Sequence, residues 1–434
     1  MFYFRNIENI FRYEFIFVFS IFFLYIIQSF LGMYYFGINP QTITALFLPT
    51  YAIMSFVAIF YLCKKFLINI KIKKIELNIN ISIIYGIFLS YLIIIFLLCI
   101  TCPKIPLVSS LLGDNQSEIY NYRLAYDLTR IGWEKFIVYF YILYYSFICP
   151  LSIIIFFEKE SKYKWLVLFI FTSTLLLSLA KTICIKAFLP LIFYYLISAK
   201  KNLKRTMLLT LFLCFSVFLS TFFYFAGPKK IYDTISTISS ISVTDKSDTI
   251  EIQPPQELPN LPNFIFSSQS PISFMLNRFL WTPYATLYAY LGFKSEIMKD
   301  KDVSIIDTIR PISILFEKKY FPYDQLAFNY QYSFYDNNDQ LRTEFIGINA
   351  APYFVEIYAK YGFLFLFFIS IFIPIFFYLV IYHSSDIIKA FFPLCILLMI
   401  SNPFITVLTN GMAFLFILLF FDIHILKSNL RKNS

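Results

Sequence analysis

Charged side chains are scarce in this chain. They make up 14% of its 434 residues, whereas hydrophobic residues make up 59% and the mean hydropathy is +0.70. This composition excludes a soluble multidomain protein, a disordered chain and a collagen-like repeat, because each of these has a far more polar or more repetitive sequence. Most of this chain must therefore be solvated by lipid.

The motifs that bind nucleotides or catalytic zinc are also missing. The chain contains no GxxxxGK[ST] loop, no GxGxxG and no HExxH, which removes nucleotide hydrolysis and zinc proteolysis by those motifs. All seven cysteines fall in or at the ends of apolar segments, which argues against disulfides and against a zinc site. The only histidines, His383 and His424, lie at predicted cytoplasmic ends of such segments. We therefore expect no cofactor, no bound metal and no histidine chemistry on the outer face.

The sequence instead contains many long apolar segments. A helix needs about 20 apolar residues to cross the roughly 30 Å hydrocarbon core of a bilayer. Ten segments reach or approach this length, so the sequence predicts an all-α polytopic membrane protein with about ten transmembrane helices. They cover residues 15–36, 43–63, 82–101, 136–157, 165–180, 185–199, 206–225, 363–382, 390–406 and 409–426. Pro393 and Pro403 interrupt the ninth.

Basic residues between these segments predict the orientation of the chain. Lys and Arg collect on the cytoplasmic flanks of transmembrane helices, and the basic clusters here share one side if the N-terminus is cytoplasmic. These clusters are Arg5 and Arg12; Lys64, Lys65, Lys71, Lys73 and Lys74; Lys159, Lys162 and Lys164; Lys200, Lys201, Lys204 and Arg205; Lys389; and Lys427, Arg431 and Lys432. We therefore expect both termini to be cytoplasmic. The net charge of +10 then reflects topology rather than nucleic-acid binding.

The first apolar segment is longer than the h-region of a signal peptide and has no small-residue cleavage site, so we expect it to remain as an anchor. Three parts follow from this topology. Residues 1–226 carry the first seven predicted helices and a small outer segment at 102–135. Residues 227–352 form one large outer loop, and residues 353–434 contain a re-entry helix and the last three predicted transmembrane helices.

The large outer loop changes character along its length. It begins with a polar, disorder-like stretch over residues 233–257 and continues with aromatic, proline-punctuated sequence. We expect short amphipathic helices in the second part, lying at the membrane surface. The clearest covers residues 276–293.

The predicted outer side has few arginines. They are Arg123, Arg130, Arg278, Arg310 and Arg342. Each is either an anion ligand, since a guanidinium forks onto phosphate oxygens, or a side chain that snorkels to the lipid headgroups. As a set over one membrane face beside aromatic residues, they favour anion binding. Lys181 and Lys186 lie at the outer turn between two short segments, where they either mark the turn or point into a membrane cavity.

Carboxylates on the outer side are the candidate acids and bases. They are Asp114, Glu118, Asp127, Asp324, Asp336, Glu344 and Glu356. Most are expected to be solvated surface groups. Glu356 is the strongest candidate, because it lies in an aromatic helix over 353–361 that enters the membrane just before Gly362, a position suited to a general base. Glu344 is next, two residues from Arg342.

A distinctive pattern ends the large outer loop. It reads Gly347-Ile-Asn349-Ala-Ala-Pro352-Tyr-Phe-Val-Glu356-Ile-Tyr358-Ala-Lys-Tyr-Gly362, and a predicted transmembrane helix follows it. Ser178-Leu-Ala-Lys181 at an outer turn and Asn277-Arg278 at the start of a loop helix add to the pattern. The arrangement resembles the O-antigen and oligosaccharide repeat-unit polymerases of the Wzy type.

The resemblance implies a metal-independent glycosyl transfer at the periplasmic face of the bacterial inner membrane. Two undecaprenyl-pyrophosphate-linked oligosaccharides meet there, and the growing chain moves onto the terminal sugar hydroxyl of a new repeat unit. Arg and Lys side chains would hold the pyrophosphate, and a carboxylate would take the acceptor proton. A chain-length regulator and a flippase are the implied protein partners.

Residue roles follow position by position. Lys181 corresponds to the arginine of the outer turn, Arg278 to that of the loop helix, and residues 349–358 to the motif before the membrane helix. We expect Glu356, Glu344 and Arg278 in catalysis. Asn349 and Tyr358 are expected to contact the acceptor glycan. The expected pyrophosphate ligands are Arg123, Arg130, Lys181, Lys186, Arg278, Arg310 and Arg342. A lysine at position 181 departs from the family pattern, because it cannot bind phosphate in the bidentate way of arginine.

Two alternatives remain open. An O-antigen ligase shares the plan but usually has a histidine just ahead of the last loop helix, where this chain reads Gly347-Ile-Asn-Ala-Ala-Pro352. A lipid-linked oligosaccharide flippase is also polytopic and basic, but such transporters tend to consist of repeated halves with short loops. This chain shows no internal repeat and has one dominant outer loop.

Overall fold

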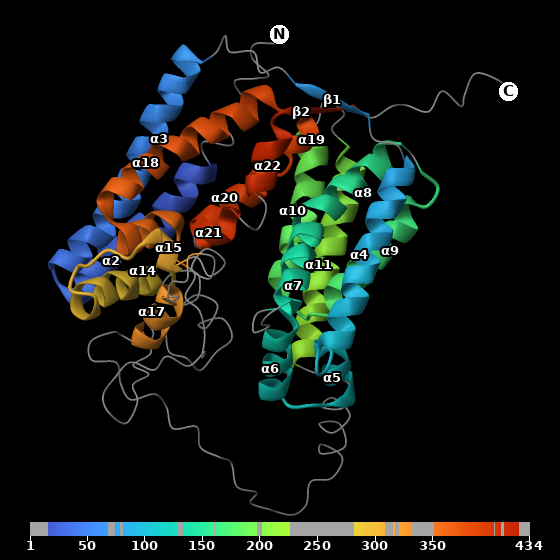
Figure 1. Ribbon diagram of the computed structural model, residues 1–434, viewed down its shortest axis with the longest axis horizontal. Helices are drawn as coiled ribbons and strands as arrows, with labels where there is room; N and C mark the ends of the chain where they lie inside the picture. Colours follow the sequence, from blue (N-terminus) through green and yellow to red (C-terminus); the bar gives the residue numbers. More distant parts are fainter. Residues whose placement is uncertain are drawn as a thin grey trace, which may run out of the picture. The chain divides into compact units, whose positions relative to one another are not determined.

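The computed structural model describes residues 16–67, 74–78, 81–127, 133–159, 161–197, 202–225, 282–308, 316, 321–331, 351–402, 404–408 and 412–424. Within them the chain is almost entirely helical (Figure 1). It forms two compact units, each built from separate stretches of sequence. The first contains residues 1–70, 249–381 and 396–408, and the second contains residues 71–248, 382–395 and 409–434.

Six described helices are long and apolar enough to cross a membrane. They are Ile16–Phe36, Pro40–Phe66, Ile81–Thr101, Glu134–Glu158, Leu203–Tyr224 and Tyr353–His383. Each coincides with one of the ten predicted segments. Many of their Phe, Leu and Ile side chains are exposed, including Phe96, Phe218 and Leu364, as expected for helices solvated by lipid. The chain is therefore an α-helical membrane protein.

The other four predicted segments are shorter or broken. Residues 165–180 contain an apolar helix of only 13 residues, Lys164–Leu176, and residues 185–199 belong to the 17-residue helix Lys181–Ile197. Residues 390–406 are interrupted, since one helix ends at Ser401, ahead of Pro403, and the next begins at Phe404. A residue that precedes proline is disfavoured in the α conformation.

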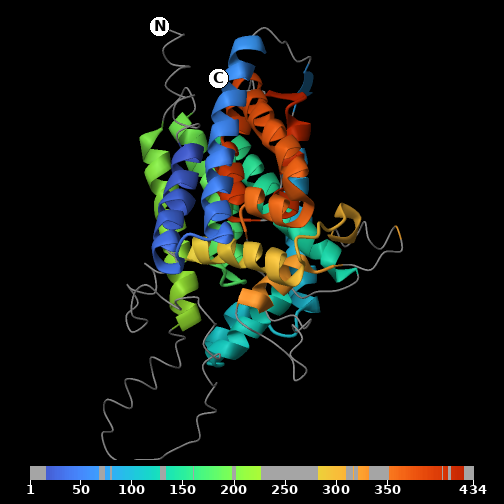
Figure 2. The same ribbon diagram turned by 90° about the vertical axis from the view of Figure 1, so that its left-hand side faces the viewer.

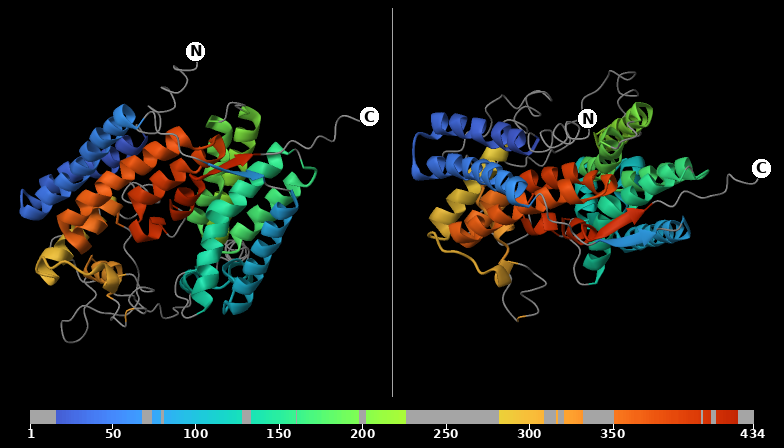
Figure 3. Two further views of the ribbon diagram at one scale, coloured as in Figure 1. Left: turned by 45° about the horizontal axis from the view of Figure 1, so that its top comes forward. Right: turned by 90° about the horizontal axis from the view of Figure 1, so that it is seen from above.

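The tenth predicted helix, over 409–426, is wrong in its second half. A helix covers Ala413–Leu418, but Phe421–His424 is strand β2, which pairs in parallel with strand β1, Ile75–Asn78 (Figure 3). Both strands alternate apolar and polar residues, which is the pattern of a strand. The pairing brings Ile75–Asn78 and Phe421–His424 side by side in one small sheet.

The first unit is built on two long helices near the N-terminus. Its elements are η1 (Phe22–Ile26), α2 (Ile27–Phe36), α3 (Pro40–Phe66), α14 (Thr282–Gly292), η3 (Phe293–Ile297), α15 (Ile305–Thr308), α17 (Tyr323–Gln331), α18 (Tyr353–His383) as far as Ile381, α20 (Phe392–Ser401) from Ile396, and α21 (Phe404–Val407). Asn39 begins α3 with a capping box, because its side chain accepts from the Thr42 N–H while the Thr42 hydroxyl accepts from the Asn39 N–H.

Helix α14 lies across α2 and α3 (Figure 2). The ring of Tyr284 occupies the space in which a side chain at Gly32 would stand, and the Tyr284 N–H donates to the Gln28 side chain. The helix predicted over 276–293 is confirmed over residues 282–292, but it is not amphipathic. Nearly every side chain from Tyr284 to Gly292 is buried, so α14 is part of the core of this unit.

Helix α18 bends at Gly362. The backbone there has φ 80° and ψ −179°, a conformation essentially confined to glycine. A Cβ atom at this position would lie 2.5 Å from a carboxylate oxygen of Asp302. The bend separates a short first part, residues 353–361, from the long second part.

The second unit is a bundle of helices with the small sheet at one end. Its elements are β1, α4 (Ile81–Thr101), α5 (Pro106–Leu112), α6 (Gln116–Asp127), α7 (Glu134–Leu143), η2 (Tyr144–Ile148), α8 (Cys149–Glu158), α9 (Lys164–Leu176), α10 (Lys181–Ile197), α11 (Leu203–Phe225), α19 (Asp386–Lys389), α22 (Ala413–Leu418) and β2. Tyr91 links two of these helices, since its hydroxyl is 2.8 Å from that of Thr174.

Candidate functional site

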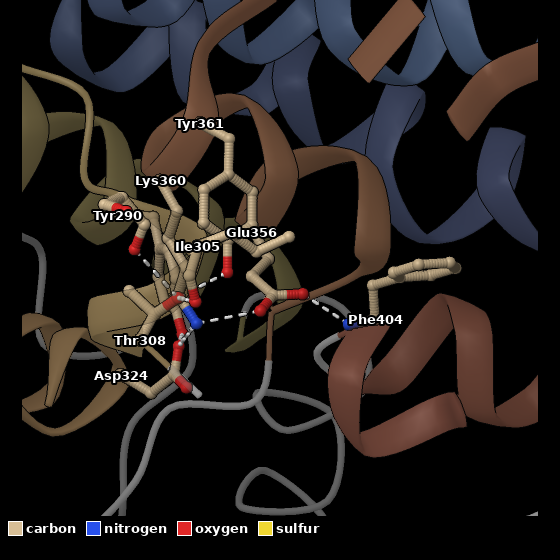
Figure 4. A network of polar contacts seen from close by, with 9 residues as sticks. Tyr290, Ile305, Thr308, Asp324, Glu356, Lys360, Tyr361 and Phe404 are labelled. Carbon is tan, nitrogen blue, oxygen red and sulfur yellow. Dashed lines mark hydrogen bonds and ion pairs between the residues drawn. The ribbon is translucent and has the colours of Figure 1, made fainter. Parts of the chain in front are cut away.

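A buried cluster of charges joins the first part of α18 to α17. Lys360 and Glu356 lie one helical turn apart, and the Lys360 ammonium is 2.8 Å from Glu356 Oε1 and 2.8 Å from Asp324 Oδ1 (Figure 4). The side chains of Glu356 and Lys360 are 0% and 4% exposed, whereas that of Asp324 is 26% exposed. Buried charges are tolerated only when they are paired and hydrogen-bonded, and this lysine is paired twice.

Neighbouring elements complete the hydrogen bonding of the two carboxylates. The backbone N–H of Phe404, at the start of α21, donates to Glu356 Oε2, so both oxygens of Glu356 are engaged. The Tyr290 hydroxyl, from α14, donates to Asp324 Oδ1 at 2.6 Å. Four elements of the first unit therefore converge on one polar cluster in an otherwise aromatic core.

A second buried cation, Lys294, binds the C-terminal end of the first part of α18. Lys294 donates to Asp302 at 2.6 Å and to the carbonyl oxygens of Tyr358 and Ala359, each at 3.2 Å. These carbonyls belong to the last turn before the bend at Gly362, and the last carbonyls of a helix lack partners within that helix. A cation at a helix C-terminus also opposes the negative end of the helix dipole. Lys294 thus fixes where this short helix ends.

The aromatic ring of Tyr323 lies beside the ammonium group of Lys360. Its ring is 5.7 Å from the Lys360 ammonium and packs on the rings of Tyr290 and Phe293. Its hydroxyl is buried and has no hydrogen-bond partner within the described part of the chain. Burial raises the pKa of Tyr323 well above its usual range, so the hydroxyl stays protonated and is available as a donor.

Asp324 is the chemically accessible member of the cluster. Its Oδ1 atom is held by Lys360 and Tyr290, while no hydrogen bond or ion pair within the described residues engages its Oδ2 atom. A carboxylate held by one oxygen and partly exposed at the other can accept a proton or a hydrogen bond from a hydroxyl. Glu356 has no exposed surface, and its two oxygens contact Lys360 and the Phe404 N–H.

The structure places only some of the residues predicted from sequence at this cluster. Glu356 and Tyr358 lie at this cluster, and the Tyr358 ring is 5.3 Å from the Lys294 ammonium. Lys360 was missed, although a lysine four residues after a glutamate is a recognisable helix pair. Six predicted residues lie outside the described residues: Arg130, Arg278, Arg310, Arg342, Glu344 and Asn349.

Three further predicted residues belong to the second unit. Arg123, on α6, stacks its guanidinium 4.9 Å from the centre of the Tyr224 ring on α11, and its Nε atom is buried without a hydrogen-bond partner among the described residues. Lys181 is the first residue of α10 and Lys186 lies in its second turn. Both lysines are partly buried, and a separation of five residues puts them on different faces of the helix.

Within the described residues, no group of three or more His, Cys, Asp or Glu side chains is placed to hold a metal ion. Comparisons with known protein families, with curated proteins and with solved structures find no match for this chain. Its class, an α-helical membrane protein with a buried ion cluster at a bend in α18, thus comes from its own sequence and geometry.

Proposed function

We propose that this protein is an O-antigen polymerase, a glycosyltransferase that joins undecaprenyl-pyrophosphate-linked oligosaccharide repeat units at the periplasmic face of the bacterial inner membrane. One observation carries the proposal. The sequence pattern that resembles the Wzy-type polymerases ends in residues 353–362, and this short helix holds Glu356 and Lys360 against Asp324 from the preceding loop. The residues behind the resemblance thus belong to the buried polar cluster formed by Glu356, Lys360 and Asp324.

The proposed reaction moves a growing glycan from its lipid carrier to a new repeat unit. A hydroxyl oxygen of the acceptor sugar bonds to the anomeric carbon of the donor glycan, and the bond from that carbon to the pyrophosphate oxygen breaks. Undecaprenyl pyrophosphate leaves with the bonding electrons, and the hydroxyl proton passes to a carboxylate. The pyrophosphate ester supplies the driving force, so the reaction needs no nucleotide.

Each part of the reaction has candidate residues. Asp324, with an oxygen directed away from its partners, is suited to take the acceptor proton, while Glu356 and Lys360 hold it in place. Glu344 stays a second candidate base. The basic residues predicted from sequence, above all Arg278 and Lys181, are proposed to neutralise the leaving pyrophosphate. Asn349 and Tyr358 are proposed to contact the acceptor glycan, and a flippase and a chain-length regulator are the proposed partners.

A second candidate is a transporter, such as a flippase for the same lipid-linked oligosaccharides. It is favoured by the bend at Gly362 within an apolar helix and by the buried ions next to it. Broken helices and intramembrane charges line the substrate sites of many transporters. In that case the Lys360 cluster would be a substrate-binding or coupling site rather than a support for a catalytic base.

Deletion of the gene distinguishes these functions. Loss of a polymerase leaves single repeat units ligated to lipopolysaccharide, whereas loss of a flippase or of an O-antigen ligase leaves no repeat unit on the cell surface. We expect a single-repeat band on a lipopolysaccharide gel, restored to a ladder by the wild-type gene. Absence of that band would overturn the polymerase assignment.

A further inference from the structure

The corner that follows α18 gathers polar groups that the proposed function does not use. His383 ends α18, Ser384 and Ser385 form the corner, and α19 begins at Asp386. All of these residues belong to the second unit, as does Lys74, which directly precedes β1. The basic clusters of the sequence place this end of α18 on the cytoplasmic side, opposite the proposed reaction.

Two hydroxyls at this corner have unused hydrogen-bonding capacity. The side-chain oxygens of Ser384 and Ser385 are buried and have no hydrogen-bond partner among the described residues. Ser384 as a whole is only 7% exposed. Ser385 occupies the N-cap position of α19 but makes no capping bond with its side chain. Buried polar groups normally find a partner, and an unsatisfied one is unfavourable, so these hydroxyls point to a ligand.

The described charged side chains of this corner include two lysines that interact with each other. Lys74 interacts electrostatically with both His383 and Lys389. Asp386 pairs with Lys389 at 3.8 Å, and its side chain is 48% exposed against 24% for that of Lys389. Burial lowers the pKa of Lys389, and the charge of Lys74 lowers it further. Among these described side chains, Asp386 pairs with Lys389 only and is exposed, so an anion near Lys74 and Lys389 would balance their charge.

We propose that this corner is a phosphate-binding site, in which the hydroxyls of Ser384 and Ser385 donate to phosphate oxygens and the ammonium groups of Lys74 and Lys389 balance the charge. A phosphate group matches both needs, because it offers several strong acceptor oxygens and negative charge at once. The end of a membrane-spanning helix lies at the level of the lipid headgroups, so the phosphate belongs either to an anionic phospholipid or to free phosphate. The site is independent of the proposed glycan transfer.

The test uses the full chain purified in dodecyl maltoside. Its thermal unfolding midpoint is followed during separate titrations with phosphatidylglycerol and with sodium phosphate, at constant ionic strength adjusted with chloride. A ligand that binds only the folded state raises the midpoint. We expect one of the two titrations to raise it. A response to phosphatidylglycerol alone identifies a lipid headgroup, and a response to sodium phosphate identifies a site for the free ion.

The decisive variant is Ser384→Ala with Ser385→Ala. Because neither hydroxyl has a partner in the described part of the chain, we expect this variant to be at least as stable as the wild type before ligand is added, yet to bind it at least about tenfold more weakly. Lys389→Met should weaken binding as well. Ser173→Ala is the matched control, since its hydroxyl is exposed and bonds to Phe169 of its own helix, and it should respond like the wild type. No response to either ligand, or an equal response from the double variant, would overturn the proposal.

Discussion

The ammonium of Lys360 and the carboxylate of Glu356 lie 2.8 Å apart, one helical turn from each other, and both side chains are buried. Removing two charges from water is costly, so such a pair persists only when further partners satisfy it. Asp324 supplies that partner for the lysine and the Phe404 N–H supplies it for the glutamate. Loss of one member alone therefore leaves an uncompensated charge in the core.

The first prediction concerns this dependence. Lys360→Met should lower the free energy of unfolding by about 3–5 kcal/mol, because it leaves Glu356 charged and buried. The double variant with Glu356→Gln removes both charges and should recover most of the loss. Thermal or chemical unfolding in detergent measures both. A Lys360→Met protein as stable as the wild type, or a double variant no better than the single one, would contradict the pairing.

The second prediction concerns the bend in α18. Gly362→Ala should destabilise the protein by about 1–3 kcal/mol through the backbone conformation alone, and by more because its Cβ would clash with Asp302. Gly86→Ala is the matched control. Gly86 lies within α4 with open space around it, so alanine should be neutral or stabilising by about 0.5–1 kcal/mol. Equal unfolding midpoints for the two variants would argue against the bend.

The third prediction concerns the proposed role of Asp324 as the base that takes the acceptor proton. Asp324→Asn keeps the shape of the side chain but removes the proposed base, so glycan polymerisation should fall by about 10²-fold or more while the protein stays folded. Glu296→Gln is the control, because Glu296 also accepts from a tyrosine, Tyr330 at 2.6 Å, but lies exposed. It should retain the ladder. Full-length ladders from Asp324→Asn would leave Glu344 as the candidate base.

The fourth prediction tests the small parallel sheet. Glu76 and Asp422 are partners in its register, and neighbouring strands are about 4.8 Å apart, close enough for a disulfide. With the seven native cysteines replaced, Glu76→Cys with Asp422→Cys should cross-link on mild oxidation. Glu76→Cys with His424→Cys shifts the register by two residues and should cross-link poorly. Equal yields from the two pairs would show that the strands do not pair this way.

The sequence was sufficient to predict the long helices. An isolated run such as residues 82–101 must be apolar on every side to face lipid, so composition alone identifies it, and the structure has a helix at Ile81–Thr101. The same signal is ambiguous for shorter segments. Residues 421–424 continue an apolar run but form a strand, because their pairing partner lies at residues 75–78, far away in the sequence.

The sequence predicted only part of the candidate site. Glu356 was singled out because it precedes a predicted membrane helix, a local property. The pairing of Lys360 with Asp324 depends on how α17 packs on α18. The two residues are 36 positions apart in different helices, so no local sequence pattern connects them. The burial of α14 was missed for the same reason, since its apolar and tyrosine side chains suit a membrane surface and a protein core equally well.

The most direct test of the account is reconstitution of the purified protein in liposomes with undecaprenyl-pyrophosphate-linked repeat units and no nucleotide. The account predicts products that carry two or more repeat units on one lipid, with release of one undecaprenyl pyrophosphate for each new linkage, and loss of both in Asp324→Asn. Single repeat units that cross the bilayer without being joined would contradict it and would identify a transporter.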